Sequence, residues 1–79
     1  MSIDAQEITT LLAEKLPGCQ INVDGGGGKF QVAIIGPVFA GLGQVKRQQM
    51  IYQHLNAHIF SGEIHAVSMK LQTPEEAGA

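Results

Sequence analysis

Apolar residues recur along the chain at spacings that predict two helices. The first is expected over residues 3–16, where apolar residues repeat every three or four positions and so share one helix face: Ile8, Leu11, Leu12 and Leu16. Asp4 with Glu7 three residues later is the pattern of a capping pair, although Ser2 is an alternative cap. The Pro-Gly pair that follows ends the helix, because proline lacks the backbone N–H that a helix needs.

The second helix is longer and is expected over residues 44–60. Four of its apolar residues lie close to one face: Val45, Tyr52, Leu55 and Ile59. Lys46, Arg47 and Gln53 lie elsewhere on the helix, so we expect them on its solvated side. Near the end of the sequence, Thr73 and Pro74 resemble a helix cap and a first helical residue, which predicts the start of another helix.

Alternation of apolar and polar residues predicts three strands. They are expected over residues 19–24, 29–36 and 64–71. Gly25 to Gly28 separate the first two strands and predict a hairpin turn, which makes those strands antiparallel. The long helix provides a right-handed crossover, which places the third strand parallel to the second.

The element order predicts an α+β sandwich, with two helices on one face of a three-stranded mixed sheet. The other face has few large side chains, so we expect it to be partly exposed. Seventy-nine residues, 44% hydrophobic and 15% charged, are enough for one folded domain, which we place at 1–79.

Cysteine content, targeting signals and net charge indicate the cellular compartment and the classes of partner to expect. Cys19 is the only cysteine, and we interpret it as a small apolar residue beside a turn, with a reactive or metal-binding thiol as the alternative. No signal peptide or run of the ~20 apolar residues that span a bilayer is visible. We therefore expect a soluble cytoplasmic protein. The net charge of −2 argues against a dominant attraction to nucleic acid or anionic membranes.

Sequence signatures of catalysis are missing. None of Ser2, Ser61 and Ser68 lies in a Gly-x-Ser-x-Gly elbow, and no Cys-x-x-Cys or His-Glu-x-x-His spacing occurs. The glycine run leads into a strand and not into a helix N-terminus, so we interpret it as a hairpin tip and not as a phosphate loop. We expect no enzymatic activity.

Three histidines are candidate metal ligands. His54 and His58 share a helix face, but no third ligand is evident, so a solvated face is the favoured interpretation. His65 begins the third predicted strand, where it shares a face with Val67 and Met69 or lies at the rim. A neutral imidazole there can bind a borderline metal, but the pattern alone favours a satisfied polar residue.

The start of the long helix is a candidate nucleic-acid site. Lys46, Arg47, Gln48 and Gln49 are residue types that contact phosphates and base edges. The preceding Phe-x-Gly-x-Gly resembles the start of a helix-turn-helix. Two positive charges make a weak electrostatic footprint, so a solvated helix start is favoured and DNA or RNA binding stays the alternative.

Several segments taken together resemble the BolA family, in particular its shorter, IbaG-type (YrbA-type) members. These segments are Phe39-Ala40-Gly41, Val45-Lys46-Arg47-Gln48-Gln49 with Tyr52 and Leu55, Ile64 to Lys70, and Thr73-Pro74-Glu75. Residues from about 3 to 76 align in order, so the resemblance covers nearly the whole chain. It implies an α+β fold similar to a class II KH domain, in agreement with the predicted element order.

The resemblance also implies a partner and a cofactor. Members of the family pair with monothiol glutaredoxins and share a [2Fe-2S] cluster, with ligands from the glutaredoxin, from glutathione and from the BolA protein. The family's invariant histidine matches His65, which makes it the expected cluster ligand. Many members offer a second histidine or cysteine between the first two strands, whereas Gly25 to Lys29 contain neither.

These observations favour an adaptor in iron–sulfur trafficking or iron regulation. Two alternatives stay open. One is a nucleic-acid-binding regulator that uses the KH-like fold and the basic helix start. The other is a protein-interaction module without a cluster, which the ligand-free glycine loop suggests. The sequence leaves the oligomeric state open, a homodimer included.

Overall fold

Helices and strands follow one another in the predicted order. The computed structural model describes residues 2–78. Its elements are α1 (Ala5–Lys15), β1 (Gln20–Gly26), β2 (Lys29–Ile35), the short 3₁₀ helix η1 (Pro37–Phe39), α2 (Gln44–Phe60) and β3 (Ala66–Gln72). The helix-strand-strand-helix-strand order confirms the predicted α+β fold, and η1 is an addition that the sequence pattern did not indicate.

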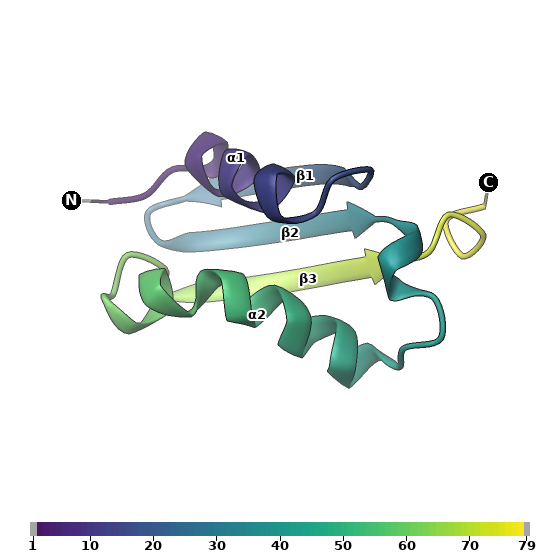
Figure 1. The fold of residues 1–79 in the computed structure, drawn as a ribbon. Coiled ribbons are helices and arrows are strands. Elements are labelled where there is room, and N and C mark those ends of the chain that lie inside the picture. Colours follow the sequence, from purple (N-terminus) through teal and green to yellow (C-terminus); the bar gives the residue numbers. More distant parts are fainter. Residues whose placement is uncertain (1, 79) are drawn as a thin grey trace.

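The sheet has the order β1-β2-β3, with β2 in the centre. β1 pairs antiparallel with β2, whose first residue Lys29 lies opposite Gly26. β3 pairs parallel with β2, and its first residue Ala66 lies beside Lys29. The tip of the β1–β2 hairpin and the start of β3 therefore lie at the same end of the sheet (Figure 1).

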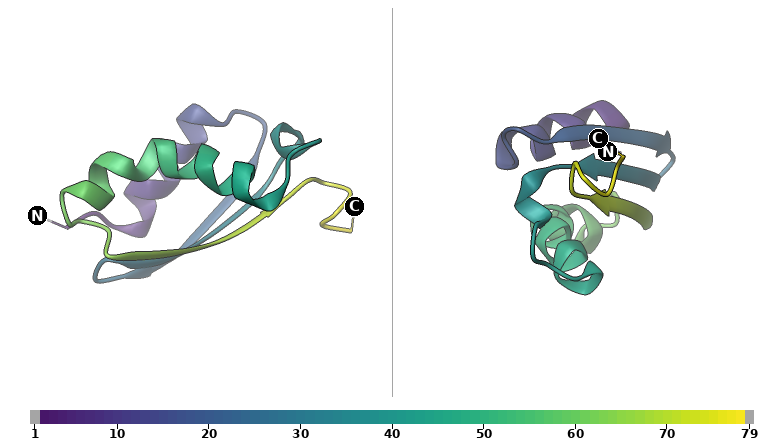
Figure 2. Two further views of the ribbon diagram at one scale, coloured as in Figure 1. Left: turned by 90° about the horizontal axis from the view of Figure 1, so that it is seen from below. Right: turned by 90° about the vertical axis from the view of Figure 1, so that its right-hand side faces the viewer.

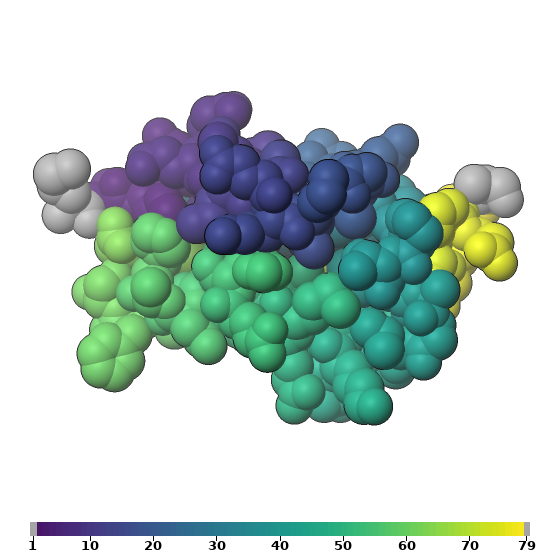
Figure 3. Space-filling model, in the orientation of Figure 1, coloured from purple at the N-terminus to yellow at the C-terminus, as the bar shows by residue number. Residues whose placement is uncertain are grey.

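Both helices cover the same face of the sheet, as predicted (Figure 2). In the space-filling view of this face, α1 lies directly beside α2 (Figure 3). The core lies between the helices and the sheet, where these residues are buried: Ile8, Leu12, Phe30, Val32, Ile34, Phe39, Ile51, Leu55 and Leu71. Each strand contributes alternate residues to this layer, because successive side chains point to opposite faces.

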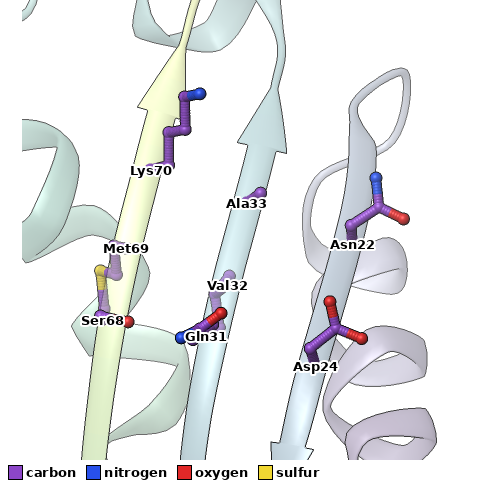
Figure 4. Close-up of a pocket in the computed structure, with 8 residues that line it drawn as sticks. All are labelled: Asn22, Asp24, Gln31, Val32, Ala33, Ser68, Met69 and Lys70. Atoms are coloured by element: carbon purple, nitrogen blue, oxygen red, sulfur yellow. The ribbon is translucent and has the colours of Figure 1, made fainter.

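The opposite face of the sheet is open and mostly polar. The register places Asp24, Gln31 and Ser68 in one row across the three strands, and Asn22, Ala33 and Lys70 in another. These side chains line a shallow hollow of about 240 Å³ (Figure 4). A polar face can remain in contact with water, which explains why two helices on one side are sufficient for this chain.

Helix α1 begins with a complete capping box at Asp4. The backbone N–H of Glu7 donates to the Asp4 carboxylate at 2.8 Å, and the N–H of Asp4 donates to the Glu7 carboxylate at 3.3 Å. Asp4 is therefore the cap and not Ser2, and the helix spans Ala5–Lys15, slightly less than predicted.

Helix α2 has the predicted bounds, but its buried face differs from the prediction. Val45 was placed on the apolar face and is 68% exposed, whereas Leu55 is buried, as expected from that face, together with Arg47 and Ile51. These three residues are four apart and form one stripe. Position 45 lies about 200° around the helix from position 47, so it faces solvent once that stripe faces inward.

The segment after β3 forms a single turn and no helix within residues 73–78. The expected cap is nevertheless present, since the N–H of Glu76 donates to Thr73 Oγ1 at 3.2 Å. In return, the N–H of Thr73 donates to the Glu76 carboxylate at 2.9 Å. β3 itself starts at Ala66, so His65 lies immediately before the strand and not within it.

Candidate functional site

His65 lies where three parts of the chain meet: the β1–β2 hairpin tip, the α2–β3 loop and the start of β3. Its backbone N–H donates to the carbonyl oxygen of Gly28 at 2.7 Å, and the N–H of Ala66 donates to the same oxygen at 3.1 Å. These bonds extend the β2–β3 ladder by one step toward the hairpin tip. The backbone of His65 is thus fixed, whereas its side chain is exposed at the rim of the sheet.

The imidazole lies between two hollows. One has a volume of about 400 Å³ and is lined by His65 with small and polar residues: Ser2, Gly27, Gly28, Ser61, Gly62 and Glu63. The other, of about 300 Å³, is lined by His65 and Ala66 with larger and mostly apolar residues: Tyr52, Ile59, Ile64 and Val67. Within residues 2–78 the imidazole makes no side-chain hydrogen bond, so its nitrogens are free to bind a ligand.

Polar contacts hold the loop that leads into His65. His58 Nδ1 lies 2.8 Å from Glu63 Oε1, and the Ser61 hydroxyl donates to the same oxygen at 3.0 Å. Hydrogen bonds from His58 and Ser61 lower the pKa of the Glu63 carboxyl. The N–H of Ile64 also donates to the carbonyl of His58 at 3.0 Å. Glu63 takes only Nδ1 of His58, but no group of three or more His, Cys, Asp or Glu side chains that could hold a metal occurs within residues 2–78, so His54 and His58 lack a third ligand there.

The donor set at His65 fits one ligand of a shared cluster. In the part of the chain that the structure describes, no group of three or more His, Cys, Asp or Glu side chains could hold a metal ion. An iron–sulfur cluster of the [2Fe-2S] type takes four ligands in all. The described residues alone therefore do not hold such a cluster, but His65 can supply one position when another molecule supplies the rest.

Cys19 lies at the other end of the sheet and cannot be the second ligand beside His65. Its sulfur is packed so closely against Gly36 that a Cβ at that glycine would lie 2.3 Å away. Gly36 follows the last residue of β2, whereas His65 lies beside the first. Burial also raises the pKa of the Cys19 thiol, which favours its protonated form.

The comparison with protein-family models decides which family the chain belongs to. The model of the BolA-like proteins matches residues 6–76. The chain belongs to the BolA family. It is 39% identical over 74 residues to the acid stress protein IbaG of Escherichia coli (strain K12), across 94% of this chain and 88% of that protein.

Solved BolA structures have the same architecture. A BolA protein homologue from Coxiella burnetii superposes with a TM-score of 0.83 at 27% identity, covering 98% of this chain and 99% of that one. The BolA domain of SufE1 from Arabidopsis thaliana also gives a TM-score of 0.83 at 27% identity, covering 96% and 98%. The predicted family and fold are both confirmed.

In this BolA protein the basic helix start is divided between the surface and the interior. Lys46, Gln48 and Gln49 are exposed, whereas Arg47 is only 5% exposed. The prediction that these four residues bind nucleic acid stays a prediction. Arg47 is not available to a ligand in this structure, so an interface here would have to use the other three side chains.

The guanidinium of Arg47 is occupied by acceptors within the protein. Its Nε donates to the carbonyl of Leu42 at 2.9 Å, and Nη1 donates to the carbonyl of Leu71 at 3.0 Å. Both terminal nitrogens also donate to the Glu76 carboxylate, and the Phe39 ring lies 5.8 Å from the guanidinium carbon. The four-residue spacing to Ile51 was a sequence signal for this inward position, but arginine is seldom buried.

No helix within residues 2–78 is long and apolar enough to cross a membrane.

Proposed function

We propose that this BolA protein is a non-enzymatic adaptor. It binds a monothiol glutaredoxin and contributes His65 to a [2Fe-2S] cluster shared with the glutaredoxin and glutathione. The observation that carries the proposal is the exposed imidazole of His65, the residue that the sequence resemblance matches to the family's histidine. The adaptor serves iron–sulfur trafficking or iron regulation. The name of the Escherichia coli relative suggests stress as the setting in which it works.

The surroundings of His65 suit a metal ligand whose other co-ligands come from a partner. The backbone is held by the hairpin, and within the described residues the side chain makes no hydrogen bond that a metal would have to displace. A neutral imidazole is a good ligand for iron. When bound, a cluster with histidine ligation has a higher reduction potential than one held by cysteines alone. His65 would therefore influence the redox chemistry of the shared cluster.

An apolar surface beside His65 supports a protein partner. The hollow of about 300 Å³ places Tyr52, Ile59 and Val67 next to the imidazole. Phe60, the last residue of α2, is 96% exposed. Exposed aromatic side chains near a polar group are common at protein interfaces and often dominate binding energy. We propose that the glutaredoxin covers this surface and brings its ligands to His65.

The test is a titration with a glutathione-loaded monothiol glutaredoxin that carries a [2Fe-2S] cluster. Visible absorption and circular dichroism report the ligands of the iron atoms. We expect the spectrum to change when the wild-type protein is added, and we expect His65→Ala to abolish that change. His54→Ala, which removes a histidine from the middle of α2, is the matched control and should behave like the wild type.

Binding is measured in parallel by isothermal titration calorimetry. If the wild-type protein binds without any spectral change, the protein is an interaction module without a cluster, and the ligand role of His65 is rejected. No binding and no spectral change would reject the adaptor proposal as a whole.

A further inference from the structure

Gly28 has an unusual place in the hairpin tip. The other glycines of the tip are exposed, whereas Gly28 is buried beneath the start of β3. Its φ angle is +84°, a conformation that favours glycine. Its carbonyl oxygen accepts both hydrogen bonds that fix the backbone of His65 and Ala66. Gly28 is thus the point at which the hairpin contacts the candidate ligand.

The imidazole of His65 occupies the space that a side chain at position 28 would need. A Cβ at Gly28 would lie 2.2 Å from Cδ2 of the ring, 3.1 Å from Cγ and 3.2 Å from Nε2. The first distance is shorter than real Cβ contacts and the other two are tight, so the His65 ring must leave its present position when residue 28 carries a Cβ. The preceding residue, Gly27, also has a positive φ of +62°, but a Cβ there would meet no atom within 4 Å.

We propose that Gly28 is the positioning residue of His65, an inference that rests on the ligand role proposed above. The Cδ2 edge of the ring lies against the glycine backbone, which limits rotation of the imidazole on that side. A ligand that is already oriented loses less conformational freedom when it binds. The glycine hairpin therefore contributes to the site without a donor atom of its own.

The test compares Gly28→Ala with the matched variant Gly27→Ala. Both changes place alanine at a positive φ, so both carry backbone strain. Only Gly28→Ala also crowds the His65 ring. In NMR spectra of the isolated protein, we expect the His65 ring resonances, identified by their loss in His65→Ala, to shift in Gly28→Ala and to stay in place in Gly27→Ala. Equal shifts in the two glycine variants would overturn the proposal.

A double-mutant cycle keeps the test decisive even if Gly28→Ala folds poorly. Urea denaturation should give Gly28→Ala an unfolding equilibrium constant roughly tenfold or more above that of Gly27→Ala, because overpacking adds to strain. In the His65→Ala background the excess should disappear, since the ring is gone. If Gly28→Ala costs the same in both backgrounds, the ring does not depend on Gly28 and the proposal fails.

The glutaredoxin titration separates this inference from the proposed function. With Gly28→Ala we expect the cluster spectrum to be altered or lost, and with Gly27→Ala to match the wild type. A wild-type spectrum with Gly28→Ala would overturn the functional part of the inference. If the mixture with His65→Ala gives the same spectrum as the mixture with the wild-type protein, His65 is not a cluster ligand. The contact between Gly28 and the His65 ring is then tested by the double-mutant cycle alone.

Discussion

Arg47 and Glu76 show how a single charged pair secures the end of the sheet. The Arg47 side chain is 6% exposed and that of Glu76 is 46% exposed, so the pair joins the interior to the surface. The Arg47 hydrogen bond, aided by the backbone N–H of Thr73, lowers the pKa of Glu76 to about 2. A carboxylate with a depressed pKa stabilises the fold above its ordinary pKa of 4.5 and loses that effect as the pH falls through about 2.

We predict that Glu76→Gln destabilises the protein at neutral pH, because the amide cannot neutralise the buried guanidinium. The difference in unfolding free energy from the wild type should shrink as the pH falls from about 4.5 toward about 2. Urea denaturation at a series of pH values measures it. Glu75→Gln, an exposed neighbour without an ion pair in the described chain, is the control and should match the wild type. A pH-independent difference would contradict the prediction.

At the scale of elements, the capping box of α1 is the clearest case of local sequence that determines where a helix begins. Asp4 accepts from the N–H of Glu7 at 2.8 Å, which satisfies one of the free donors in the first turn. We predict that Asp4→Ala lowers the unfolding free energy by about 1 kcal/mol, the usual effect of removing such a cap. Urea denaturation monitored by circular dichroism provides the measurement.

Ser2→Ala is the matched control for the cap. Ser2 is exposed and was the alternative cap suggested by the sequence. Because Asp4 already fills that role, Ser2→Ala should stay within about 0.5 kcal/mol of the wild type. If Ser2→Ala lowered the unfolding free energy as much as Asp4→Ala does, the helix would be capped differently in solution.

At the scale of the whole molecule, charge argues against strong nucleic-acid binding. The net charge is −2, and Arg47 is paired with Glu76, which leaves Lys46 as the exposed base at the start of α2. We predict weak binding to labelled single-stranded DNA or RNA at ~50 mM salt and its loss near ~200 mM, because few phosphates can be neutralised. Fluorescence anisotropy at both salt concentrations measures this.

The control variants are Lys46→Ala and Lys70→Ala, which remove one exposed charge each from α2 and from the open face of the sheet. Tight binding that persists at the higher salt and falls only with Lys46→Ala would support the nucleic-acid alternative instead. Equal, small effects of the two variants would indicate a general electrostatic attraction without a site.

Local patterns in the sequence were sufficient to predict α1, α2, the three strands and the family, but they missed η1 and suggested a helix after Thr73 that does not form within residues 73–78. The bounds of α2 were predicted correctly, and those of the strands were predicted to within two residues, because hydrophobic periodicity and glycine turns are local properties of the chain. The order of these elements then allowed few topologies, so the mixed sheet followed. The importance of His65 was also visible from sequence, although only through the resemblance to BolA proteins.

Contacts between side chains that are far apart in the sequence became visible in the folded structure. Arg47 was expected on the surface, but it reaches Glu76, 29 residues away, and is buried. Gly28 was interpreted only as part of a hairpin tip, but the parallel pairing of β2 and β3 brings it under the imidazole of His65. Periodicity describes one element at a time, whereas these contacts depend on how elements pack, and that is the physical reason why the sequence could not reveal them.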